Sequence, residues 1–163
     1  MLNSANNEIL TRVGPGTAMG GLFRQFWQPA LLCEELPAPD CPPVRVRLMG
    51  ENFVAFRDSG GKVGLLDAHC PHRLAELFFG RNEEGGLRCV YHGWKFSVTG
   101  ELLDMPSEPA GSPMRCNPNI RAKAYSVHEA GGIVWAYLGP QECVPPLPQM
   151  EFMSLPAQNF YTS

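Results

Sequence analysis

The sequence contains no long apolar run and no leader-like beginning. Its charge-free stretch 130–141 is well short of the roughly 20 residues that a membrane-spanning helix needs. Residues 1–14 are polar and lack the charged-then-apolar pattern of a secretory signal. We therefore expect a cytoplasmic protein that has no membrane partner.

Runs of lysine or arginine are also absent. The 13 basic residues are outnumbered by 16 acidic ones, and the formal net charge is −3. A phosphate backbone is recognised through clustered positive charge, so nucleic acid is not an expected partner. Charged residues make up only 18% of the chain, against an average near 25%, which is consistent with a face that another domain covers.

The six cysteines include no Cys-x-x-Cys pair. Because no secretory signal is present, reduced thiols are expected rather than a disulfide framework. Four cysteines are widely spaced and are interpreted as ordinary packing residues: Cys33, Cys41, Cys116 and Cys143. They give little support for a second metal site.

Glycine (17 residues) and proline (16 residues) make up about a fifth of the chain, against roughly 12% on average. This composition favours a loop-rich β protein over a helical bundle. Alternating apolar and polar residues, separated by glycine-containing turns, predict antiparallel strands. The predicted strands are 44–48, 53–56, 63–66, 94–96, 102–103, 124–127 and 133–138.

One short helix is predicted before the strands, capped by Thr17 and ended before Pro29. Prolines break any regular element after Gly139. We therefore expect an all-β domain at 41–140. An N-terminal extension at 1–40 is expected to pack on it, and a proline-rich exit at 141–163 is expected to lead toward a catalytic domain outside this sequence.

Two short clusters carry the candidate chemistry: Cys70-Pro71-His72 and Cys89-Val90-Tyr91-His92. Each offers one thiolate and one imidazole at the end of a predicted strand. A Rieske-type [2Fe-2S] cluster needs two cysteines on one iron and two histidines on the other, so one ligand of each kind per loop satisfies it. The chemistry indicated is one-electron transfer.

A structural zinc site uses the same residue types and is the main alternative. Zinc sites generally pair like with like, as Cys-x-x-Cys and His-x-x-x-His, whereas both pairs here are mixed. Outside the clusters, His69 is interpreted as a solvated side chain or one that lies next to the ligands, and His128 as a surface imidazole. Neither is a predicted ligand. The sequence therefore favours the iron–sulfur cluster over a zinc-stabilised interaction module.

The two boxes, Cys70-Pro71-His72-Arg73 and the CVYHGWKF sequence at 89–96, resemble those of Rieske non-haem iron aromatic-ring-hydroxylating oxygenases. The segments 26–29, 85–88, 104–106 and 132–140 extend the resemblance, which is greatest to large subunits of the phenoxybenzoate and toluenesulfonate oxygenase type. It implies three small antiparallel sheets with the cluster at one tip. It also implies that Arg73, Gly93 and Trp94 surround the cluster ligands.

The resemblance implies partners as well. Oxygenases of this family, both monooxygenases and dioxygenases, receive electrons from a flavin or ferredoxin-type reductase and pass them to a mononuclear iron in a catalytic domain or a neighbouring subunit. No histidine and carboxylate pattern in this sequence builds that second site, so we expect no oxygenation by this chain alone. A free-standing Rieske ferredoxin, an electron carrier with no enzyme activity, is the alternative.

Three details of the boxes and of a neighbouring segment stay open at this point. The first box has Leu74 where the family usually has glycine, so a left-handed backbone there would be strained. Arg73 is either an exposed charge or a residue that positions the first loop. The segment 104–109 is either a stiff cover over the cluster or an ordinary surface loop.

Neither box has a second cysteine, which places the reduction potential toward the low end of roughly −150 to +300 mV.

Overall fold

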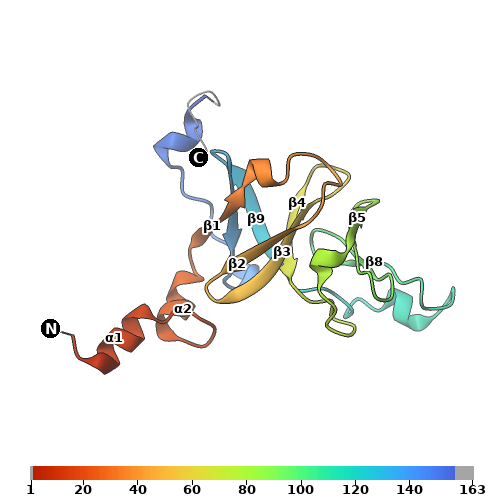
Figure 1. The fold of residues 1–163 in the computed structure, drawn as a ribbon, viewed down its shortest axis with the longest axis horizontal. Helices are drawn as coiled ribbons and strands as arrows, with labels where there is room; N and C mark the ends of the chain where they lie inside the picture. The colour runs from red at the N-terminus through yellow and green to blue at the C-terminus, as the bar shows by residue number, and fades with distance from the viewer. Residues whose placement is uncertain (1, 157–163) are drawn as a thin grey trace.

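Two antiparallel sheets form the body of the protein (Figure 1). A computed structural model of the chain describes residues 2–156. The strand order is β1-β10-β9-β4-β3-β2 in the larger sheet and β5-β6-β7-β8 in the smaller one. The larger sheet contains β1 Trp27–Leu32, β2 Val44–Leu48, β3 Glu51–Arg57, β4 Val63–Asp67, β9 Ala124–Ala130 and β10 Ile133–Tyr137. The smaller sheet contains β5 Arg81–Glu83, β6 Gly86–Arg88, β7 Lys95–Phe96 and β8 Leu102–Asp104.

The predicted all-β class is confirmed, and so is the predicted antiparallel pairing. The pairing of β4 with β9, through Leu65 opposite Tyr125 and Leu66 opposite Ala124, joins two groups of three strands into the larger sheet. The structure therefore has two sheets where the resemblance implies three, because the hydrogen-bonded pairing of β4 with β9 joins two of them.

Strands β3 and β4 are buried on both faces and separate two apolar cores. Phe53 and Ala55 of β3 face the first core, whereas Val54 and Phe56 face the second. The first core is formed by side chains from the strands of the larger sheet, which pack against one another. The second lies between this sheet and the smaller one, and it contains both Cys70 and Cys89. The unbroken apolar run of β3 is what a strand covered on both sides requires.

The predicted N-terminal helix is present as α2 Ala18–Phe23, where the Thr17 hydroxyl accepts a hydrogen bond of 3.1 Å from the amide of Gly20. The preceding helix, α1 Ser4–Thr11, was not predicted. Its cap is Asn3, whose side chain accepts from the amide of Asn6. None of its side chains is buried, so it lacks the apolar stripe that would have revealed it in the sequence.

Strands β1, β5 and β6 were also not predicted. Strand β1 contains Pro29, and its register shifts between Pro29 and Leu31, which lets an edge strand accommodate a proline. Strands β5 and β6 are short and rich in charge. Arg81 and Arg88 are directly opposite each other in this pair.

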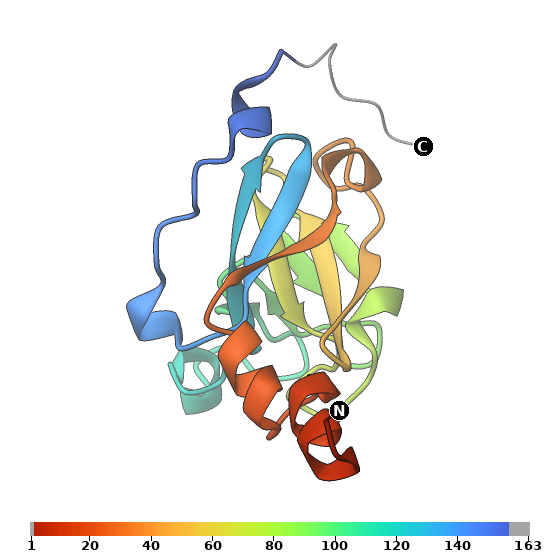
Figure 2. The same cartoon turned by 90° about the vertical axis from the view of Figure 1, so that its left-hand side faces the viewer.

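The segment after β10 runs along the outside of the larger sheet (Figure 2). Among residues 138–156 it forms only two short 3-10 helices, Gln141–Cys143 and Glu151–Ser154, as the prolines predict. The indole of Trp27 donates a hydrogen bond of 2.9 Å to the carbonyl of Pro145 and fixes this segment to β1. Residues 157–163 of the predicted exit lie outside the described residues, as does the side chain of Cys116.

Candidate metal centre

The first cluster loop leaves the end of β4 and returns at residue 76. His69 and Glu76 pair as an isolated β-bridge and form its stem. Within the loop the amide of Cys70 donates to the carbonyl of Ala75 at 2.8 Å, and the amide of Leu74 donates to the carbonyl of Cys70 at 2.9 Å. These bonds fix the backbone on both sides of His72.

The second cluster loop joins β6 to β7 and is closed in a similar way. The amide of Gly93 donates to the carbonyl of Cys89 at 3.1 Å, and the amide of Cys89 donates to the carbonyl of Trp94 at 2.9 Å. In each loop the residue four positions after the cysteine has a positive φ, +56° at Leu74 and +74° at Gly93. The two loops therefore share one turn geometry, with a leucine in one of them where the other has glycine.

The structure brings the four predicted ligand residues together from these loops. Cys70 and Cys89 are each 2% exposed in the second core, and both are free thiols. Burial, together with the neighbouring Cys89, raises the pKa of the Cys70 thiol to about 11. The rings of His72 and His92 lie beside each other, with centroids 4.6 Å apart.

One atom in this group is unsatisfied. The Nδ1 atom of His72 is buried and makes no hydrogen bond to any of the described residues. A buried polar atom without a partner costs free energy unless something binds it. Two buried thiols and a histidine with an open ring nitrogen are the donors that a Rieske cluster requires, so the residues fit this group.

A single metal ion fits less well. Within residues 2–156 no group of three or more His, Cys, Asp or Glu side chains is arranged to hold one ion. A mononuclear zinc site needs all four donors within about 2.0–2.3 Å of one point, whereas each iron of a two-iron cluster takes only two protein donors. The mixed Cys and His pairs of the two loops together match the two donors that each iron of such a cluster takes.

Trp94 covers one face of the site. Its ring stacks on His72, with centroids 4.3 Å apart and an interplanar angle of 2°. Its indole nitrogen donates to the hydroxyl of Ser107 at 3.1 Å. A Cβ atom on Gly93 would lie 2.7 Å from the Cγ of Pro106. The segment 104–109 therefore packs against the second loop, and glycine at position 93 permits that close approach.

The remaining residues singled out from the sequence lie at the surface. Arg73 is exposed, and its side chain forms no hydrogen bond or ion pair with the rest of the described chain. Its positioning role therefore stays a prediction without a contact to support it. His69 and His128 are exposed, in agreement with their interpretation as solvated side chains.

Arg88 is a residue of the site to which the sequence analysis assigned no role. Its guanidinium donates to Glu83 at 2.6 Å, to the carbonyl of Gly93 at 2.8 Å and to Asp104 at 2.8 Å. It thereby links β5, β8 and the second cluster loop. Its side chain is only 14% exposed. The sequence signal was its place in segment 85–88, which extends the resemblance and ends directly before the second box.

These ion pairs predict acid sensitivity. Hydrogen bonds from Arg88 hold the pKa of Asp104 and that of Glu83 below their usual values. A carboxylate with a lowered pKa stabilises the fold above its unfolded-state pKa, near 4, and this contribution is lost as the pH falls through the lower folded value. We expect the free energy of unfolding to decrease below about pH 4, as measured by urea titration at each pH. Arg88→Met should flatten this dependence, and an equally steep dependence in the variant would contradict the assignment.

Leu74 predicts a stabilising substitution. A left-handed φ costs a non-glycine residue roughly 1–2 kcal/mol in the folded state. Glycine avoids this cost, but it loses more backbone entropy on folding, which offsets roughly 0.5–1 kcal/mol of the gain. The leucine side chain is 72% exposed, so little buried contact is lost. Leu74→Gly is therefore expected to raise the free energy of unfolding by about 0.5–1 kcal/mol. Leu103→Gly, at an exposed strand position without positive φ, should lower it, and destabilisation by both would refute the strain at position 74.

The comparison with protein families agrees with this geometry. The sequence profile of the Rieske [2Fe-2S] domain family matches residues 26–126. The chain therefore belongs to the Rieske [2Fe-2S] domain family. No helix within residues 2–156 is long and apolar enough to cross a membrane.

The most similar curated proteins include oxygenase subunits of aromatic-ring dioxygenases. The chain is 50% identical to the oxygenase subunit of 3-chlorobenzoate-3,4-dioxygenase from Comamonas testosteroni, over 96% of this chain and 35% of that protein. It is also 50% identical to the oxygenase subunit of phthalate 4,5-dioxygenase from Pseudomonas putida, over 89% of this chain and 33% of that protein. The chain thus spans about a third of the length of these relatives and matches their N-terminal portion.

Solved structures show the same fold. Dicamba monooxygenase, with non-haem iron and dicamba, superposes with a TM-score of 0.67 at 28% identity, over 78% of this chain and 38% of that chain. The oxygenase of carbazole 1,9a-dioxygenase, solved in complex with ferredoxin, gives a TM-score of 0.66 at 28% identity, over 85% of this chain and 33% of that chain.

Proposed function

We propose that this chain is the electron-transfer domain of an aromatic-ring oxygenase subunit. The cluster ligands in this proposal are Cys70 and Cys89 on one iron and His72 and His92 on the other. The observation that carries it is the convergence of two buried thiols and two adjacent imidazoles from separate loops, with the Nδ1 atom of His72 buried and unpartnered.

One-electron transfer is the chemistry that the cluster supplies when bound. The protein's own residues give it a defined environment. The second core keeps water from the two cysteines, and Trp94 fixes the plane of the His72 ring by stacking on it. Arg88 fixes the second loop through the carbonyl of Gly93. Fixed, partly dry ligands need little rearrangement when the charge on the site changes, which is what a rapid electron carrier requires.

The proposed partners are the protein that donates the electron to this domain and the iron site that accepts it from this domain. We infer that a flavin or ferredoxin-type reductase donates the electron, and that a mononuclear iron in a catalytic domain or a neighbouring subunit accepts it. The similar oxygenase structure that contains a bound ferredoxin supports a protein donor. The full oxygenase would act on substituted aromatic compounds, and the relatives named after such compounds support this class.

The proposed division of the chain follows from these roles. Residues 41–140 form the cluster domain, 1–40 an extension that packs on it, and 141–163 the exit toward the catalytic domain. The fixed contact between Trp27 and Pro145 supports an extension and an exit that lie together on one side of the domain. A cytoplasmic location is also proposed, supported by the free thiols of Cys33, Cys41 and Cys143.

The experiment that tests the cluster is metal analysis combined with low-temperature EPR of the dithionite-reduced protein, purified without added zinc. We expect about two irons per chain and a rhombic Rieske signal with a midpoint potential toward the low end of roughly −150 to +300 mV. Zinc at about one ion per chain, with no EPR signal, would replace the proposal with a structural zinc module. Oxygenation of an aromatic substrate by this chain alone would contradict the assignment of a purely electron-transferring role.

A further inference from the structure

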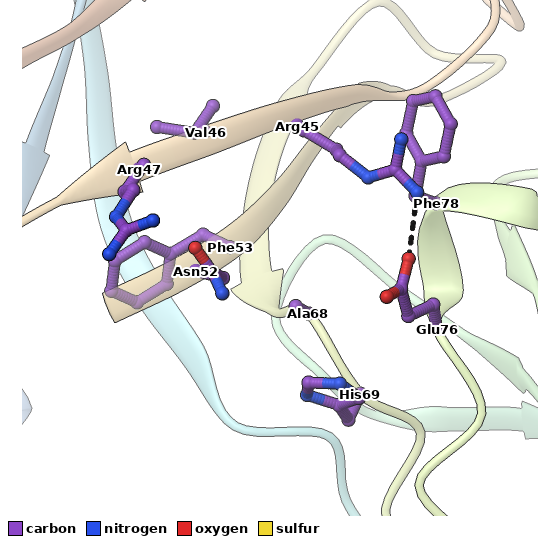
Figure 3. Close-up of a pocket in the computed structure, with 9 residues that line it drawn as sticks. All are labelled: Arg45, Val46, Arg47, Asn52, Phe53, Ala68, His69, Glu76 and Phe78. Atoms are coloured by element: carbon purple, nitrogen blue, oxygen red, sulfur yellow. Dashed lines mark hydrogen bonds and ion pairs between the residues drawn. The ribbon is translucent and has the colours of Figure 1, made fainter. Parts of the chain in front are cut away.

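A cavity of about 330 Å³ lies between β2 and the stem of the first cluster loop (Figure 3). Its volume is at the low end of the range of roughly 300–1,000 Å³ that small-molecule sites occupy. Apolar residues form part of its wall, and charged and polar side chains stand around them. The apolar residues are Val46, Phe53, Ala68 and Phe78. The side chains of Val46 and Phe53 face the first core, so Ala68 and Phe78 provide the apolar side chains on the face of Arg47 and Asn52.

At one end of this cavity the charges are already paired. Arg45 donates to Glu76 at 2.8 Å, and its guanidinium carbon lies 3.7 Å from the ring centroid of Phe78. Glu76 is the only carboxylate in the wall, and this ion pair occupies it. The pair leaves no anionic group free to attract a cation.

At the other end the polar groups are unpaired. Arg47 on β2 and Asn52 on β3 are directly opposite each other in the strand register, so their side chains are neighbours on one face. His69 stands across the cavity from them (Figure 3). The side chains of these three residues make no hydrogen bond or ion pair within the described part of the chain. Arg47 therefore gives this end a net positive charge, and Asn52 adds an amide donor.

We propose that this cavity binds a small organic carboxylate that has an apolar body. Its carboxylate would accept hydrogen bonds from Arg47 and Asn52, since a planar guanidinium matches a carboxylate in geometry and charge. Its body would lie on the apolar wall beside Phe78. A phosphate or sulfate would use the same donors but would leave that wall wet, and a cation would meet the unpaired guanidinium.

This site is distinct from the cluster, because none of the four proposed cluster ligands lines it. It adjoins the cluster loop only through the stem residues His69 and Glu76. Binding can therefore be measured whether or not the proposed electron-transfer function holds, and the failure of one leaves the other intact.

The test is ligand-observed fluorine NMR of 4-fluorobenzoate with the full chain. We expect saturable binding, with 4-fluorobenzyl alcohol, the uncharged analogue, and inorganic phosphate each at least about tenfold weaker. Arg47→Gln should weaken binding of the carboxylate at least about tenfold, because it removes the charged donor. Asn52→Ala should weaken it by about threefold or more.

The matched control is Lys62→Gln, which removes the same charge at the opposite end of the sheet. Lys62 is next to Val63, at the end of the β3–β4 pairing where Val63 is opposite Arg57. Asn52 is next to Phe53, at the other end of this pairing. This control should change the affinity by less than about twofold. Binding that is not saturable, that is equal for the alcohol, or that survives both Arg47→Gln and Asn52→Ala would overturn the proposal. Positions 47 and 52 are exposed, so the variants are expected to fold, and circular dichroism checks this.

Discussion

Replacing Cys89 by serine is expected to abolish iron binding. The thiol is 2% exposed and stands with Cys70 in the second core, where the cluster needs a thiolate. A serine hydroxyl is far less acidic than a thiol and is a poor ligand for iron at neutral pH. The iron content should fall from about two per chain to nearly none, and the EPR signal should disappear with it.

Loss of the metal should also lower stability. In the proposed site the metal would satisfy the two thiols of the second core and the two adjacent imidazoles, so part of the binding free energy would be folding free energy. We expect Cys89→Ser to unfold at a lower temperature than the parent protein. This effect is the largest that we predict, because the substitution removes both the cofactor and the reason for the loop geometry.

Cys143→Ser provides the matched control. Cys143 is an exposed free thiol in a 3-10 helix after β10, outside both cores. The same chemical change there should leave iron content, EPR signal and stability unaltered. Full iron content in Cys89→Ser, or equal losses in both variants, would show that the cysteines of the two loops are not the ligands.

Replacing Arg88 by methionine has the second largest expected effect. The substitution keeps much of the apolar stem but removes three hydrogen bonds, to Glu83, to Asp104 and to the carbonyl of Gly93. Asp104 retains Arg115 at 3.2 Å, so its charge is not left wholly unpaired. Because the guanidinium is largely buried and its carboxylate partners are about one third exposed, we expect a loss of about 2–3 kcal/mol in the free energy of unfolding.

The same substitution should loosen the second cluster loop, since the carbonyl of Gly93 loses its donor. We expect iron to dissociate faster from Arg88→Met in the presence of a chelator, at a pH where Asp104 is ionised. Arg81→Met is the control, because Arg81 also pairs with Glu83, at 3.3 Å, but its side chain is 72% exposed. Its loss should cost less than about 1 kcal/mol. Equal stability of the two variants would mean that Arg88 does not hold the loop.

Local sequence patterns predicted most of the strands because they depend on near neighbours. The period-two run at 44–48 matches β2, and the apolar run at 53–56 lies within β3. Thr17 caps its helix as predicted, since a cap needs only the next three residues. Strand β1 was missed because Pro29 argues against a strand, and only the pairing with β10 and a register shift make it one.

The sequence already predicts the proposed ligand types and their order, because two mixed Cys and His boxes match the donors of a Rieske cluster wherever the loops lie. It also determined that the second loop has a glycine where its turn is left-handed. The contacts between distant segments are visible only in the folded chain: the stacking of Trp94 on His72, the ion pairs of Arg88 and the cavity beside Arg47. Those contacts join residues far apart in the chain, so they depend on the path of the whole backbone, which no local pattern specifies.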